Sequence, residues 1–112
     1  MKLIGSKAER EFREELIDSN ISLNNESERL NQVLNSTGHQ LSKSYVLNHI
    51  PEQCEDIYVL LISGTYILNV EIDKSDSEVT PIIERVELND YLRGLSKIHQ
   101  IQMAVAMGLV ET

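Results

Sequence analysis

The sequence predicts an α+β domain in the order α-α-β-β-β-β-α: an N-terminal helical hairpin, a four-stranded antiparallel meander and a C-terminal helix. Apolar residues recur at helical spacing near both ends of the chain and alternate with period two in its middle. A Ser-Gly pair divides the most strongly patterned stretch, residues 57–73, into two apolar runs. The length of 112 residues suits one domain, 1–112, and we expect its helices to cover one face of the sheet.

The first expected helix begins at Ser6, which forms a Ser-x-x-Glu capping box with Glu9. Phe12 and Leu16 belong to a narrow apolar stripe with four-residue spacing, and the helix is expected to end near residues 18–20. This pattern is typical of a surface helix that docks by one edge.

A second helix is expected after a short turn, because Asn25 and Glu28 form another cap pair. Gly38 suits the left-handed conformation that often ends a helix. The apolar stripe of this helix consists of Leu30, Val33 and Leu34. The two helices are therefore expected to form a hairpin.

Residues 57–73 predict a β-hairpin with Ser63 and Gly64 at the two central positions of a tight turn. In this register the residues on either side of the pair face each other, and Asp56 faces Glu71. One face of the hairpin is then almost entirely apolar. The other face is mixed, with apolar residues near the turn and acidic residues at the far end.

Two further strands are expected on either side of the hairpin, at residues 44–50 and 81–88. Asn89 and Asp90 cap a final helix, in which residues 98–110 carry no formal charge and are expected to be largely buried. The apolar stripe of this helix consists of Leu92, Leu95, Ile98, Ile101 and Val105.

The acidic charge is concentrated in one segment. Residues 52–90 hold ten acids and two bases, which accounts for the whole formal net charge of −8. Direct binding of nucleic acid by this segment is not expected, since phosphates require a basic surface. A basic partner or a cation would be attracted instead.

Several classes of protein are not expected from the sequence. No apolar run reaches the roughly 18 residues that span a bilayer, and the first residues lack the apolar core of a signal peptide. A single cysteine, Cys54, fits a reducing compartment, so we expect a cytoplasmic protein. No intact catalytic or nucleotide-binding motif occurs, so we expect neither an enzyme nor a cofactor.

The mixed face of the hairpin is the leading candidate for a binding surface, because aliphatic groups ringed by acids are typical of protein interfaces. We therefore expect a small non-catalytic protein-binding module, for example an inhibitor or immunity-type protein that covers a basic partner surface. A homodimer through this face is the structural alternative. The residues expected to bind a partner are Tyr58, Leu60, Ile67, Asn69, Glu71, Asp73 and Glu87.

A divalent-metal site is the other alternative, with Asp56, Glu71 and Asp73 as ligands, because hard cations bind carboxylate oxygens. Fraying of the strand end, or pairing of the acids with Arg85, would equally offset their repulsion. Metal-dependent nucleases place a lysine two residues after such a glutamate, on the same face of the strand. Here Lys74 comes one position later and is expected on the opposite face, so the motif is broken.

Overall fold

The computed structural model describes residues 6–112 and confirms the expected fold class. The sheet has the meander order β1-β2-β3-β4, with every neighbouring pair antiparallel. No helix within residues 6–112 has both the length and the apolar character needed to cross a bilayer. Residues 1–5, on which the expectation about a signal peptide partly rests, lie outside the described residues. The elements are α1 (Lys7–Leu23), α2 (Arg29–Ser36), β1 (Tyr45–Pro51), β2 (Glu55–Ile62), β3 (Tyr66–Asp73), β4 (Ile82–Glu87), α3 (Leu88–Leu92) and α4 (Lys97–Val110).

The two N-terminal helices form as expected, with different limits. The Ser6 hydroxyl accepts a hydrogen bond from the Glu9 N–H at 3.1 Å, which confirms the first cap. Helix α1 continues to Leu23, past the expected end. Helix α2 begins at Arg29 rather than at the Asn25 cap pair, since the Asn25 side chain bonds to Ser27 within the preceding turn.

The expected C-terminal helix is divided into two. Gly94, with φ of +81°, separates α3 from α4, and Ser96 caps α4 by accepting the His99 N–H. Ile98 of the expected stripe is 47% exposed. The second half of α4 is largely buried, as expected, and its buried apolar residues are Met103, Val105, Ala106 and Leu109.

The register of the central hairpin differs from the prediction by one residue. The turn forms where expected: Ser63 and Gly64 both have positive φ, and the Thr65 N–H donates to the Ile62 carbonyl at 2.9 Å. However, the first paired residues are Ile62 and Tyr66, so Thr65 remains outside the ladder. A single extra residue on one strand moves every later partner by one position.

The predicted pairing of Asp56 with Glu71 is therefore wrong. Asp56 pairs with Ile72, and Glu71 pairs with Ile57. Because paired residues of an antiparallel ladder point to the same side of the sheet, Asp56 and Glu71 lie on opposite faces.

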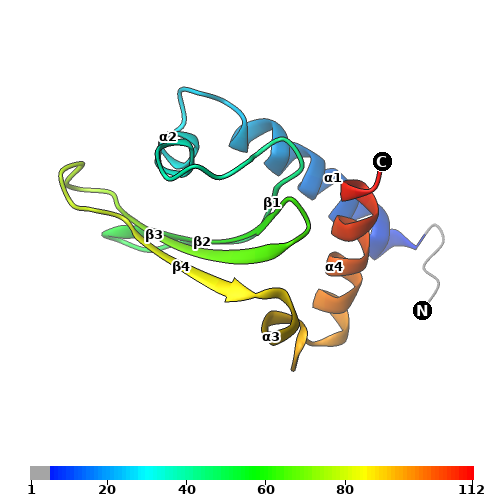
Figure 1. The fold of residues 1–112 in the computed structure, drawn as a ribbon. Helices are drawn as coiled ribbons and strands as arrows, with labels where there is room; N and C mark the ends of the chain where they lie inside the picture. The colour runs from blue at the N-terminus through cyan, green and yellow to red at the C-terminus, as the bar shows by residue number, and fades with distance from the viewer. Residues whose placement is uncertain (1–5) are drawn as a thin grey trace.

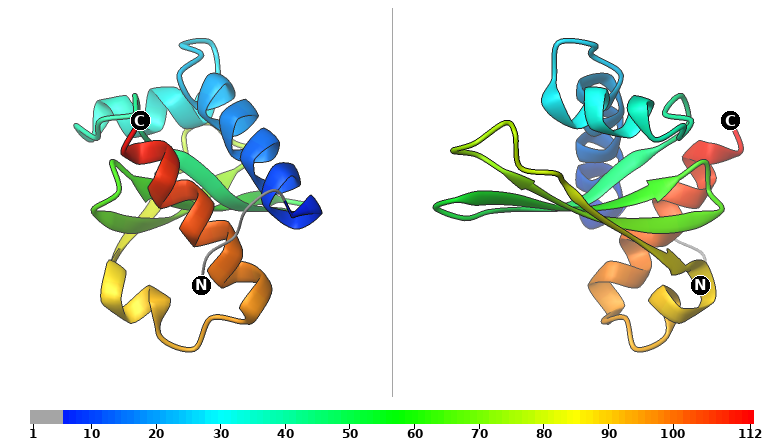
Figure 2. Two further views of the ribbon diagram at one scale, coloured as in Figure 1. Left: turned by 90° about the vertical axis from the view of Figure 1, so that its right-hand side faces the viewer. Right: turned by 60° about the vertical axis from the view of Figure 1, so that its left-hand side comes forward.

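Helices cover both faces of the sheet near the hairpin turn, not one face as expected. Leu60 and Ile62 belong to a core cluster with Leu30 and Leu34 of α2. The intervening Leu61 packs in a second cluster with Leu16 of α1 and with Met103, Ala106 and Leu109 of α4. Figure 1 shows α2 above the sheet, α3 below it and α4 beside one end. Figure 2 shows α1 and α4 side by side at that end.

The half of the sheet remote from the turn projects beyond α3 and α4. It consists of the end of β1, the start of β2, the end of β3 and the start of β4. The right-hand view of Figure 2 shows these strand ends extending away from the C-terminal helices, with α2 on one side only. One face of this half is therefore left uncovered.

We expect Gly64→Ala to destabilise the protein more than Gly38→Ala. Both glycines have positive φ, but an added Cβ at Gly64 would lie 2.8 Å from a methyl carbon of Val110, whereas nothing lies within 4 Å at Gly38. Gly38→Ala should cost about 1–2 kcal/mol for its backbone conformation alone, and Gly64→Ala should cost about 1 kcal/mol more. Urea denaturation measures both losses. In a Val110→Ala background, Gly64→Ala and Gly38→Ala should lower the free energy of unfolding by the same amount. Equal losses for these two variants with Val110 present would contradict a clash between the added Cβ and Val110.

Candidate functional site

The uncovered half-face of the sheet, called the open face below, is built by the observed strand register. Ile57 pairs with Ile50 on one side and with Glu71 on the other, and Glu71 pairs with Ile82. These residues form one row across all four strands. The open face consists of the side chains of Asn48, Ile50, Glu55, Ile57, Val59, Asn69, Glu71, Asp73, Ile82 and Glu84.

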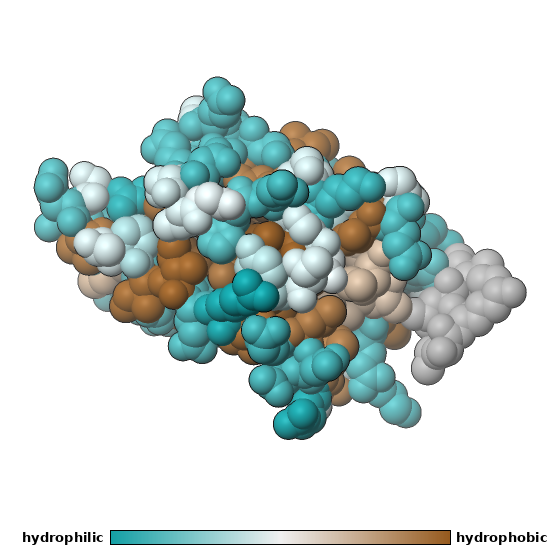
Figure 3. All heavy atoms as spheres, viewed as in Figure 1, coloured by the Kyte–Doolittle hydropathy of each residue, from teal (hydrophilic) through white to brown (hydrophobic). Residues whose placement is uncertain are grey.

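The centre of the open face is aliphatic and hollowed. Ile50 is 43% exposed and Ile82 is 61% exposed, although both are large apolar residues on strands. Figure 3 shows brown, apolar residues at the left of the molecule, near the start of β4 and next to teal, hydrophilic residues. A hollow of about 350 Å³ is lined by Ile57, Val59, Asn69, Glu71, Ile82 and Glu84. Exposed aliphatic groups around a hollow can bury their area against a partner.

The rim of the open face is acidic, and among residues 6–112 its carboxylates form no ion pair, although Asp73 accepts hydrogen bonds from Ser75 and Asp76. Its acids are Glu55, Glu71, Asp73 and Glu84, and the strand residues that point to this face include no Lys, Arg or His. Glu55 and Asp73 are direct cross-strand partners, an arrangement that destabilises a sheet because like charges repel.

The acids on the opposite face of the same strands have basic partners. The Asp56 carboxylate lies 2.9 Å from His49 Nε2 and 3.4 Å from Lys74 Nζ. Glu87 lies 3.4 Å from Arg85 Nε. The two faces therefore differ in charge compensation, although they belong to the same strands.

Local contacts lower the pKa of two carboxyls at the far end of the sheet. Partial burial raises the pKa of Asp56, but the hydrogen bond from His49 and the charge of Lys74 outweigh it, so the pKa lies below its ordinary value. The pKa of Asp73 is also lowered, first by the hydrogen bond from the Asp76 N–H and then by those from Ser75. Both groups are therefore ionised throughout the neutral pH range.

The structure divides the seven residues expected to bind a partner. Asn69, Glu71 and Asp73 lie on the open face. Ile67 points to the same side but is 0% exposed beneath α4, and Leu60 is 0% exposed on the opposite face. Tyr58 and Glu87 also lie on the opposite face. A single mixed face made of all seven residues was thus a wrong prediction. The one-residue register shift is the cause for Tyr58 and Leu60, and the pairing of β4 with β3 is the cause for Glu87.

The sequence interpretation missed the residues of β2 and β4 that complete the open face: Glu55, Ile57, Val59, Ile82 and Glu84. Their alternation in the sequence does place each set on one side of its own strand. The missing information was the partner position on β3, which alternation within a single strand does not contain.

The three carboxylates considered for a metal site do not converge. Asp56 is on the opposite face from Glu71 and Asp73, and no group of three His, Cys, Asp or Glu residues within residues 6–112 is placed to hold a metal ion.

Arg85, the alternative partner for these acids, pairs with Glu87 instead. Lys74 lies on the face opposite Glu71, as expected, and its ammonium group lies beside Asp56.

Comparison with protein-family models, with curated proteins and with solved structures finds no match to this chain.

We expect Asp56→Asn and Glu71→Gln to have opposite effects on stability. Asp56→Asn removes the charge that His49 and Lys74 hold, and should lower the free energy of unfolding by about 0.5–1 kcal/mol, since both partners are partly exposed. Glu71→Gln removes an unpaired charge from an acidic face and should leave stability unchanged or raise it by up to about 0.5 kcal/mol. Urea denaturation at pH 7 and low salt measures both. A loss in Glu71→Gln as large as that in Asp56→Asn would contradict the difference between the faces.

The lowered pKa of Asp56 predicts a loss of stability in acid. The unfolded chain takes up the proton at a higher pH than the folded protein does, so this contribution is present above about pH 4 and is lost as pH falls through the folded pKa. Thermal unfolding from pH 6 down to pH 2 should show a steeper decline for the wild type than for Asp56→Asn. Parallel declines would show that Asp56 is not stabilised in the folded state.

Proposed function

We propose that this protein is a non-catalytic binding module whose open face receives a basic surface of another protein. The observation that carries the proposal is the contrast between the faces. On the α2 side the strand acids have basic partners, whereas on the open face they have none and surround exposed aliphatic side chains. Repelling charges kept around an uncovered apolar centre are costly in the free protein and favourable only with a partner.

The two components of the open face would contribute differently to binding. The acidic rim attracts a basic partner over a distance of about 8–10 Å at physiological salt and mainly raises the association rate. The central isoleucines, Ile50, Ile57 and Ile82, supply the apolar area whose burial holds the complex together. An inhibitor or immunity-type protein that covers the basic active site or nucleic-acid-binding surface of its target is one concrete form of this function.

The charge pattern favours a foreign partner over a second copy of this chain. Two open faces packed together would bring acidic rims against each other, with no base among their strand residues to compensate. Like charges across an interface cost free energy and suppress that pairing. A monomer in solution at neutral pH and low salt is therefore expected, and analytical ultracentrifugation determines the mass directly.

Selection from a random peptide library tests the proposal without requiring an identified partner. Peptides enriched on the wild-type protein should combine Lys or Arg with apolar residues. Their affinity should fall by about ten-fold or more in Glu71→Gln/Glu84→Gln and should also fall as salt is raised. Fluorescence anisotropy with the enriched peptides measures both effects.

The matched control is Glu26→Gln/Glu111→Gln, which removes the same charge from two exposed positions outside the open face. It should retain the wild-type affinity. Equal weakening of peptide binding by both double variants would show that affinity depends on net charge alone and not on the open face. Affinity that is independent of salt, or no enrichment of basic peptides, would overturn the proposal.

A further inference from the structure

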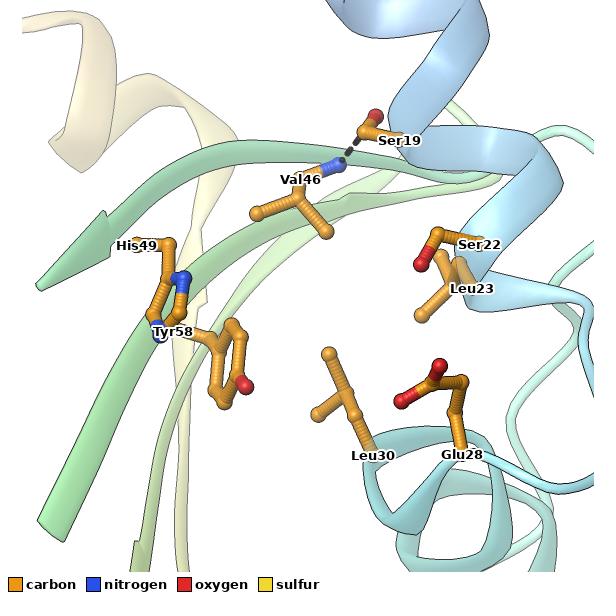
Figure 4. A pocket seen from close by; sticks show the side chains of 8 residues that line it. All are labelled: Ser19, Ser22, Leu23, Glu28, Leu30, Val46, His49 and Tyr58. Atoms are coloured by element: carbon orange, nitrogen blue, oxygen red, sulfur yellow. Dashed lines mark hydrogen bonds between the residues drawn. The ribbon is translucent and has the colours of Figure 1, made fainter. Parts of the chain in front are cut away.

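The covered face of the sheet contains a recess that is separate from the open face. It lies between the end of α1, the start of α2 and the strands β1 and β2, and Figure 4 shows it from close by. The recess has a volume of about 370 Å³, which is within the range of small-molecule sites. Its lining residues are Ser19, Ser22, Leu23, Glu28, Leu30, Val46, His49 and Tyr58.

Three oxygen-bearing side chains of the recess have no hydrogen-bond partner among residues 6–112. They are the Ser22 hydroxyl, the Glu28 carboxylate and the Tyr58 hydroxyl. Ser22 and Glu28 are exposed residues on the helical side of the recess, and Figure 4 shows the Leu30 side chain between the Glu28 carboxylate and the Tyr58 hydroxyl. The neighbouring Ser19 hydroxyl differs, because it donates to the Leu16 carbonyl and accepts the Val46 N–H. The three unpartnered groups come from α1, from the residue before α2 and from β2.

The remaining walls of the recess are apolar, and the tyrosine is held in place. Leu23, Leu30 and Val46 present aliphatic side chains to the space. The His49 ring stacks on the Tyr58 ring at 4.4 Å between centroids and 11° between planes, and His49 is itself hydrogen-bonded to Asp56. A ligand with an apolar body would therefore meet a largely preformed surface.

The charge that faces the recess is negative. Glu28 is the only Asp, Glu, Lys or Arg in its lining. The nearby cations, Arg29 and Lys74, line an adjoining hollow of about 300 Å³ that shares Glu28, Leu30 and Tyr58 with the recess. There Lys74 donates to the Glu52 carbonyl and lies beside Asp56, and Arg29 reaches the Ser77 carbonyl. Burial first, and then the negative charges of Asp56 and Glu28, raise the pKa of Tyr58.

We propose that this recess binds a small primary amine carried on an apolar or aromatic body. The Glu28 carboxylate is the anionic acceptor for the protonated amine, and the Ser22 hydroxyl on the same side of the recess is a second acceptor. The carboxylate of Glu28 supplies the charge-assisted bond, and the aliphatic wall receives the body of the ligand. This site is independent of the open face, because it uses the opposite side of the sheet.

Phenethylamine is the probe, with 2-phenylethanol as a neutral molecule of the same shape. Titration of each into the ¹⁵N-labelled protein at pH 7, followed by NMR, should give saturable shifts for phenethylamine at the amides of Ser22, Leu30 and Tyr58. The alcohol should bind about two- to five-fold more weakly, because it lacks the charge that pairs with the exposed Glu28. Equal affinity for the two probes, or the absence of saturable shifts, would overturn the proposal.

Glu28→Gln should weaken phenethylamine by about two- to five-fold, since Glu28 is an exposed residue. The fold should persist in this variant, since Glu28 precedes α2 without making a side-chain cap bond. Glu26→Gln, an exposed position two residues away, is the matched control and should bind like the wild type. Equal weakening in both variants would contradict a specific role for Glu28.

Tighter binding of Nα-acetyl-lysine methylamide than of phenethylamine would assign the recess to a lysine of a polypeptide and overturn the small-ligand proposal.

Discussion

The pairing of β2 with β3 is the constraint on which the two faces of this molecule depend. The ladder begins at Ile62 and Tyr66, and Thr65 remains unpaired after the Ser63–Gly64 turn. That single residue decides which side chains of β2 share a face with Glu71. In a ladder shifted by one position, Glu71 would stand opposite Asp56. In the observed ladder, Asp56 lies beside His49 and Lys74. Glu71 lies on the opposite face, between Ile57 and Ile82.

The same register explains why the sheet has two cores at one end and a bare face at the other. Near the turn, successive residues of β2 enter clusters on opposite sides, so both faces need helical cover. Helix α1 fixes the entry of the chain into β1, because the Asn20 amide donates to the Leu41 and Ser44 carbonyls. Farther from the turn, the acids of the open face alternate with the apolar residues that pack beneath α2. One strand thus serves a core and an exposed surface at once.

The sequence was sufficient for the order of helices and strands, apart from the break in the C-terminal helix, and insufficient for the register. Helical and alternating periodicity, together with the Ser6 cap, predicted the folding units because each signal is local. The register of the hairpin is not local, and Leu60, Leu61 and Ile62 are all apolar, so the pattern near the turn fits two alignments equally well. Asn69, Glu71 and Asp73 were grouped correctly because alternate residues of one strand share a face in any register. Tyr58 and Leu60 were assigned to the wrong face because their assignment required the correct partner strand position.

The uneven pairing of charge has a consequence for how the two proposed sites coexist. A sheet selected only for stability would distribute its bases to compensate acids on both faces, since like charges in neighbouring positions are destabilising. Here the two strand bases, His49 and Arg85, both lie on the α2 side. His49 pairs there with Asp56, and Arg85 pairs with Glu87. The open face retains its repulsion in the free protein, where only solvent and dissolved ions screen it. Because neighbouring residues of a strand point to opposite sides, each face can change its chemistry without altering the contacts of the other.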